Sequence, residues 1–160
     1  MLTPALLNNI YAAIGAAVWH MQFMEDVLVT CVTMRTKLTR GMALRDAHQI
    51  LAQERRKTLG AMLRDAEQAG ILGSVVGEAF EVLKERNWLI HRSMHEVNDH
   101  LYDDSVRDAF IERVRTLTDR SIELKSLLYQ DTSAWCRAQG IDIDKLEAEA
   151  LEQFRRIRDA

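Results

Sequence analysis

The sequence predicts an all-α protein, an up-and-down helical bundle of four to five helices. Its 160 residues include one Pro and seven Gly, and 48% of them are hydrophobic. That composition suits helices, which tolerate few glycines and almost no proline in their interiors. Apolar residues recur three and four positions apart over long stretches, which is the helical period. Because the connections are short, neighbouring helices should pack antiparallel. The length predicts a single domain, residues 1–160.

The first helix begins with Thr3 as its N-cap and Pro4 at the first helical position, and it runs to about Met34. Residues 5–24 contain no Lys, Arg, Asp or Glu. A membrane span is nevertheless disfavoured, because polar residues interrupt the run and much of it is weakly hydrophobic Ala and Gly. We expect a buried helix, no export signal and a cytoplasmic location without membrane contact.

Four further helices follow in order. Thr39-Arg40-Gly41 marks a break, and the second helix runs from about Ala43 to Ala69 with Gly70 as its C-terminal glycine. Ser74 can cap a third helix that reaches about Val97, and Asn98-Asp99-His100 resembles a turn. The fourth helix has Asp103 or Asp104 as its N-cap, runs to about Ala138 and is closed by Gly140. A short last helix covers about residues 144–158.

Charge and cysteine content restrict the classes of function. The net charge of −3 argues against a general nucleic-acid coat protein, whose phosphate contacts require a basic excess, but it leaves room for a local basic pocket. Cys31 and Cys136 lie far apart without a CxxC pattern, which is typical of reduced thiols in the cytoplasm. No glycine-rich nucleotide loop and no local nucleophile signature is present.

The third helix carries the most informative residues, Arg86, Asn87 and His91. On a helical wheel of about 100° per residue, Asn87 and His91 fall in the middle of an apolar face. That face comprises Val76, Phe80, Leu83, Met94 and Val97, and Arg86 lies at the edge of the wider apolar arc. Polar groups facing a core cost about 1–3 kcal/mol each unless they are satisfied, so their presence indicates a site or an interface.

An arginine and a histidine together can cleave RNA without a metal. Histidine titrates near neutral pH and serves as base or acid, while arginine binds phosphate oxygens and the charge that develops on them. Asn87 precedes His91 by one turn and can orient the imidazole. Arg86 and His91 lie about 140° apart on an ideal wheel, so a shared phosphate requires a curled arginine, a bend or a second subunit. The structural alternative is a buried Asn–His pair, with Arg86 bound to an acid such as Glu85 or Asp65.

The segment from Leu83 to His91, LKERNWLIH, resembles the signature of HEPN domains: an arginine, a polar residue that is usually asparagine, and a histidine after four to six positions. The resemblance implies a HEPN-like helical bundle with the motif toward the end of one long helix. Many HEPN domains are metal-independent endoribonucleases, including toxins and phage-defence proteins, with composite active sites across a homodimer. Others are inactive binding or dimerisation modules.

By this resemblance, Arg86 would contact phosphate, Asn87 would support it, and His91 would be the acid/base group, with no cofactor. The implied partners are a second copy, an RNA or nucleotide ligand, and an antitoxin or other partner protein. Trp88 is interpreted as core, dimer contact or base-stacking platform. The alternative functions are a non-catalytic dimerisation or scaffold protein and a helical metal-binding protein.

Two further polar sets are a group of histidines near the end of the third helix and a basic run in the second helix. His91 and His95 have the one-turn spacing of two metal ligands, with Glu96 and His100 nearby, but the stretch lacks the catalytic glutamate of HExxH zinc enzymes. The run Glu54-Arg55-Arg56-Lys57 is the densest positive cluster, and on a helix its side chains form a solvated face. If the second and third helices abut, that run adds charge near Arg86 and Lys84.

Overall fold

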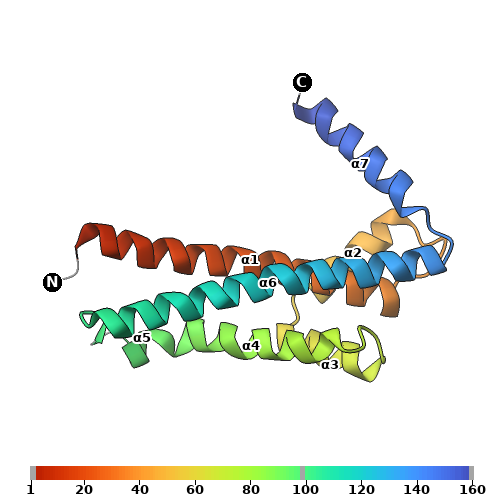
Figure 1. The fold of residues 1–160 in the computed structure, drawn as a ribbon. Coiled ribbons are helices and arrows are strands. Elements are labelled where there is room, and N and C mark those ends of the chain that lie inside the picture. The colour runs from red at the N-terminus through yellow and green to blue at the C-terminus, as the bar shows by residue number, and fades with distance from the viewer. Residues whose placement is uncertain (1–2, 98–99, 159–160) are drawn as a thin grey trace. The chain divides into compact units, whose positions relative to one another are not determined.

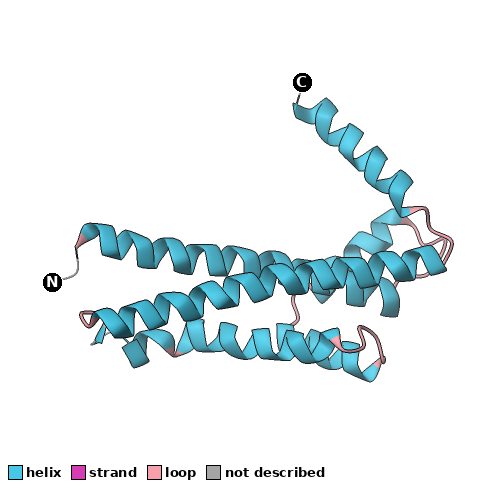
Figure 2. Cartoon of the chain, viewed as in Figure 1, coloured by secondary structure: helices cyan, strands magenta, loops and turns pink. Residues whose placement is uncertain are grey.

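The computed structural model describes residues 3–97 and 100–158, and within them the chain forms helices and loops without a strand (Figure 2). This confirms the all-α class. The chain divides into two compact units, Met1–Leu128 and Tyr129–Ala160, and each is described by itself. The described residues form seven helices where four or five were predicted, because two of the predicted helices each contain a break.

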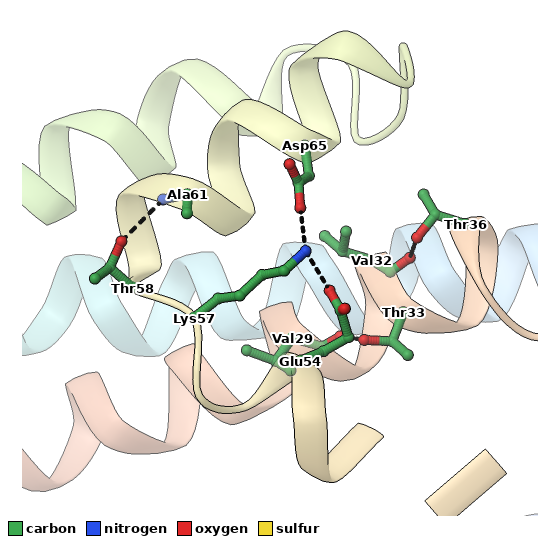
Figure 3. Close-up of polar contacts among 9 residues, drawn as sticks. All are labelled: Val29, Val32, Thr33, Thr36, Glu54, Lys57, Thr58, Ala61 and Asp65. Carbon is green, nitrogen blue, oxygen red and sulfur yellow. Dashed lines mark hydrogen bonds and ion pairs between the residues drawn. The ribbon is translucent and has the colours of Figure 1, made fainter. Parts of the chain in front are cut away.

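The first helix, α1 (Pro4–Thr36), begins as the sequence predicts. The hydroxyl of Thr3 accepts a hydrogen bond from the Leu6 amide, and Pro4 occupies the first helical position. Near its C-terminus, Thr33 and Thr36 donate side-chain hydrogen bonds back to the carbonyls of Val29 and Val32 (Figure 3). The predicted break follows, with Gly41 at φ +87°, a backbone conformation that favours glycine.

The predicted helix over 43–69 is wrong in its middle, where the chain forms α2 (Leu44–Glu54) and α3 (Leu59–Gln68). Thr58 adopts an extended conformation, and its hydroxyl accepts from the Ala61 amide, which starts a new helix. Lys57 then fixes the turn, since its ammonium group lies 2.8 Å from both Glu54 and Asp65 (Figure 3). These hydrogen bonds raise the pKa of Lys57. Gly70 follows α3 with φ +64°, as predicted.

The predicted third helix is also divided, into α4 (Val75–His91) and α5 (Ser93–Val97). Arg92 leaves the helical conformation, and the buried Ser93 hydroxyl donates to the Leu89 carbonyl. Ser74 precedes α4, but its side chain makes no capping hydrogen bond, which corrects that prediction. Asn98 and Asp99 of the predicted turn lie outside the described residues. Asp103 caps α6 (Asp104–Ala138) by accepting from the amides of Ser105 and Val106.

In the first unit, α4 runs antiparallel to α1 and to the neighbouring part of α6 (Figure 1). Between them lies a core of fully buried side chains that includes Met21, Met24, Leu28, Met62, Leu63, Val82, Val114, Leu117 and Leu124. Two ion pairs, Glu85–Arg113 and Glu78–Arg120, connect α4 with the antiparallel α6. No helix in the described residues is long and apolar enough to cross a membrane.

The second unit holds the end of α6 and α7 (Ile143–Arg158), close to the predicted 144–158. Gly140 follows α6 at φ +73°, and the Asp142 carboxylate accepts from the Lys145 amide to cap α7. Arg137 pairs with Asp144, and the Tyr129 hydroxyl donates to Glu147, which raises the pKa of Tyr129. The apolar side chains Leu146, Leu151, Phe154 and Ile157 of α7 are exposed.

Candidate functional site

The orientation of α4 corrects the predicted helical wheel. Its buried side is formed by Val76, Ala79, Val82, Trp88 and Leu89. Asn87 and His91 are exposed, and so is Met94 of the face that was predicted to be buried. Because both side chains are exposed, neither Asn87 nor His91 carries the desolvation cost of a buried polar group. Their apolar neighbours Phe80 and Leu83 are half-buried, so the exposed face of α4 combines polar groups with apolar surface.

Arg86 is held at the edge of this face by a residue of α1. Its Nε donates to Glu25 Oε1 at 2.7 Å, and its Nη1 donates to Asn87 Oδ1 at 3.3 Å. The side chains of Arg86 and Glu25 are 29% and 27% exposed, so solvent reaches both. The guanidinium is planar and has five donors, and neither contact uses its Nη2 nitrogen. The structural alternative paired Arg86 with an acid such as Glu85 or Asp65; Arg86 does pair with an acid, but this acid is Glu25, because Glu85 and Asp65 bind Arg113 and Lys57.

His91 is the last residue of α4 and lies one turn after Asn87. Its imidazole is exposed, and no hydrogen bond or ion pair joins it to another described residue. Arg86 and Asn87 touch each other, but Arg86 is directed toward Glu25 of α1 while His91 is in solvent. One chain therefore brings Arg86 and Asn87 together and does not bring His91 into contact with Arg86.

Trp88 belongs to the packed part of the first unit. Its ring is buried, lies 5.9 Å from the ring of Phe110, and is covered by the Arg113 guanidinium at 3.5 Å. The indole N–H donates to Glu96 Oε2 at 2.6 Å. Of the three interpretations of Trp88, the structure shows core packing within the chain. Arg113 also forms a bidentate contact with Glu85, which lowers the pKa of that carboxyl.

A hollow of about 530 Å³ lies next to Asn87, between α4, α5 and α6. Lys84, Arg92 and Arg113 contribute positive charge to its lining, whereas Glu85 and Glu96 contribute negative charge. Both acids are engaged, by Arg113 and by Trp88 respectively. With three cations and two carboxylates in its lining, the hollow carries a formal charge of +1 beside the predicted site, on a chain whose net charge is −3.

The basic run Glu54-Arg55-Arg56-Lys57 lies at the end of α2 and in the turn after it, and not within a helix as predicted, while Arg55, Arg56 and Lys57 are exposed to solvent, as predicted. Arg55 pairs with Asp26 of α1 at 2.8 Å. Arg55 and Lys57 also line a second hollow, of about 240 Å³, together with Glu25. The run is thus connected to Arg86 through Glu25.

The histidines do not assemble into a metal centre. Glu96 is bound by Trp88, and within the ranges that the structure covers no three His, Cys, Asp or Glu residues lie close enough to hold a metal ion. Cys31 and Cys136 are buried and form no disulfide with each other.

Comparison of the chain with family models, with curated protein sequences and with solved structures found no match. Sequence reasoning did not find Glu25 and Arg113, the two residues that hold the site and its neighbouring hollow. The one signal for Glu25 is its position as the first Lys, Arg, Asp or Glu of the sequence.

Proposed function

We propose that this chain is a HEPN-like, RNA-binding protein that cleaves RNA without a metal, through Arg86, Asn87 and His91 in a composite site between two copies. The observation that carries the proposal is the state of His91: an exposed imidazole without a partner among the described residues, one turn from an Asn87 already joined to Arg86. A structural histidine is normally fixed by a hydrogen bond, whereas an acid/base group must be accessible to its substrate.

The chemistry follows from these groups. His91 of one copy removes the proton from a ribose 2′-hydroxyl, whose oxygen attacks the adjacent phosphorus. The bond from phosphorus to the 5′-oxygen breaks, and a second imidazole protonates that oxygen, leaving a 2′,3′-cyclic phosphate end. Arg86 stabilises the charge on the phosphate oxygens, and Asn87 orients the guanidinium through its Oδ1.

A second copy supplies what one copy lacks. Two proton-transfer groups are needed, and one chain offers one suitably placed imidazole. The exposed apolar residues Ile90 and Met94 flank His91, which favours contact with another surface at this point. Lys84 and Arg92 of the adjoining hollow supply positive charge for the RNA backbone on either side of the cleaved phosphate.

A second candidate function is a non-catalytic dimerisation or scaffold protein. The observation in its favour is the ion pair between Arg86 and Glu25, which already satisfies the arginine within one chain. In that case the polar residues of α4 organise an interface and do not act on phosphate.

The deciding experiment is RNA cleavage in EDTA by purified wild type, His91→Ala and His95→Ala. The two histidines are exposed and four residues apart in the sequence, so His95→Ala is the matched control. We expect cleavage by wild type and by His95→Ala and none by His91→Ala, with all three equally folded by circular dichroism. Intact RNA with all three proteins refutes the nuclease and leaves the scaffold, and equal cleavage by all three refutes the assignment of cleavage to His91.

A further inference from the structure

The outward face of α1 is apolar and aromatic. Tyr11, Trp19 and Phe23 are 65%, 60% and 48% exposed, although they lie on a regular helix of the first unit. Trp19 and Phe23 contact each other edge to face, with ring centroids 5.2 Å apart. Exposed aromatic residues grouped in this way mark interaction surfaces, because single exposed apolar residues are common and clusters are not.

The same face carries no charged residue of α1. No Lys, Arg, Asp or Glu lies between residues 5 and 24, and His20 is half-buried. Charges lie at the end of the face: the acids Glu25 and Asp26, and Lys125 of α6, whose ammonium nitrogen is 5.9 Å from the centroid of the Phe23 ring. A face of this kind repels neither a second copy of itself nor another neutral surface. It gives no attraction to nucleic acid, whose binding depends on positive charge. On an ideal helix Trp19 lies about 120° from Glu25, the residue that faces α4, so this surface differs from the Arg86–His91 face.

Gly15 lies between the aromatic residues and has no role in its own chain. It is exposed in the interior of α1, and a Cβ added there would meet nothing within 4 Å. Its φ is not in the left-handed region, so the backbone does not require glycine. A glycine in a helix interior is unfavourable relative to alanine, and on a helix surface it allows a second backbone to approach closely.

The order of residues about Gly15 is self-complementary. We infer that α1 binds α1 of a second copy, antiparallel, with the two-fold axis at Gly15. That arrangement places Tyr11 of each copy opposite Trp19 of the other, and the exposed amides of Asn8 opposite those of Gln22. Two Tyr11–Trp19 pairs then lie on either side of the point where the two helix backbones approach at Gly15. The Asn8–Gln22 amide pairs, whose groups can both donate and accept hydrogen bonds, lie at the two ends of the contact.

The expected strength is modest. Aromatic side chains bury about 150–250 Å² each, so the exposed parts of these three offer roughly 300 Å² per copy, against about 800 Å² per partner in a stable complex. We therefore expect a reversible dimer with a dissociation constant on the order of 10 μM, in addition to any contact at the Arg86–His91 face.

Cysteine crosslinking tests both the contact and its symmetry. Each residue adds 1.5 Å along a helix, so two copies of position 11 lie about 12 Å apart in this arrangement, beyond the reach of a disulfide, whereas two copies of position 15 meet. With copper–phenanthroline as oxidant, Gly15→Cys should form a covalent dimer and Tyr11→Cys alone should not. A mixture of Tyr11→Cys with Trp19→Cys should crosslink between the two variants. Cys31 and Cys136 are buried and give little background.

Two controls complete the test. Gly77→Cys places a thiol at another exposed helical glycine with open space around it, and it should crosslink at least ten times more slowly than Gly15→Cys. Gly15→Leu should lower the weight-average mass in sedimentation at 50 μM below that of wild type, because it blocks the α1 contact and leaves any contact at the Arg86–His91 face. Equal crosslinking at positions 11, 15 and 77, or a wild type that is monomeric at 50 μM, overturns the inference. Neither readout depends on RNA, so the result is independent of the nuclease proposal.

Discussion

Replacing Glu25 by glutamine separates the catalytic interpretation of Arg86 from the structural one. The ion pair between Glu25 and Arg86 is neither fully exposed nor fully buried. Exposed ion pairs contribute about 0.2–1 kcal/mol to stability, whereas removing one partner of a buried pair costs about 3–5 kcal/mol. With both side chains a little under one-third exposed, and with the glutamine oxygen still able to accept from Arg86 Nε, we expect a loss of about 1 kcal/mol. Urea unfolding followed by circular dichroism measures it.

RNA binding should change in the opposite direction. If Arg86 contacts phosphate, the Glu25 carboxylate lies about 7 Å from that phosphate and repels it by roughly 1 kcal/mol at an effective dielectric constant of about 40. Glu25→Gln should therefore strengthen the binding of a short RNA about fivefold in fluorescence anisotropy at low salt. Glu78→Gln is the matched control, because it removes the same charge from a similar ion pair, with Arg120. If both variants bind RNA as wild type does, or change affinity equally, Arg86 does not bind phosphate.

Three further predictions concern stability. Thr58→Ala removes the hydroxyl that caps α3 and should destabilise the first unit by about 1 kcal/mol in urea unfolding; an unchanged midpoint would contradict the role of this cap. Gly15→Ala should stabilise the monomer by about 0.5–1 kcal/mol at dilute concentration, since its Cβ meets nothing, and a loss of stability there would show that α1 is already covered. Arg113 lowers the folded-state pKa of Glu85, so that pair contributes stability above the unfolded-state pKa of about 4.3 and loses it as pH falls through the lower folded-state value. Glu85→Gln should accordingly flatten the acid limb of a plot of unfolding free energy against pH, and an unchanged limb would refute the assignment.

Helix ends were predictable where one residue determines them locally. Thr3 with Pro4, Gly70, Asp103 and Gly140 act through hydrogen bonds or backbone conformations within a few residues of themselves. The break before Thr58 was missed although Thr58 is a good N-cap. The three preceding residues, Arg55, Arg56 and Lys57, all favour helix, and the contact of Lys57 with Asp65, which helps to stabilise the turn, forms only in the folded chain.

The orientation of α4 was not predictable from its pattern. Apolar residues occur on nearly every side of this helix, since Phe80, Val82, Trp88 and Ile90 point in four different directions on the wheel. Such a pattern does not define one buried face, and packing against α1 and α6 selects it. The partner of Arg86 was missed for a related reason: Glu25 is 61 residues away, and only the tertiary fold brings the two together.

The most direct test of the central claim is the chemistry of the RNA ends after incubation with wild type in EDTA. We predict 2′,3′-cyclic phosphate ends, and we predict that an RNA with a single 2′-deoxyribose at the cleaved position stays intact there. Ends with a 3′-hydroxyl, cleavage at the deoxy position, or no cleavage would contradict the assignment of Arg86, Asn87 and His91 to metal-independent RNA cleavage.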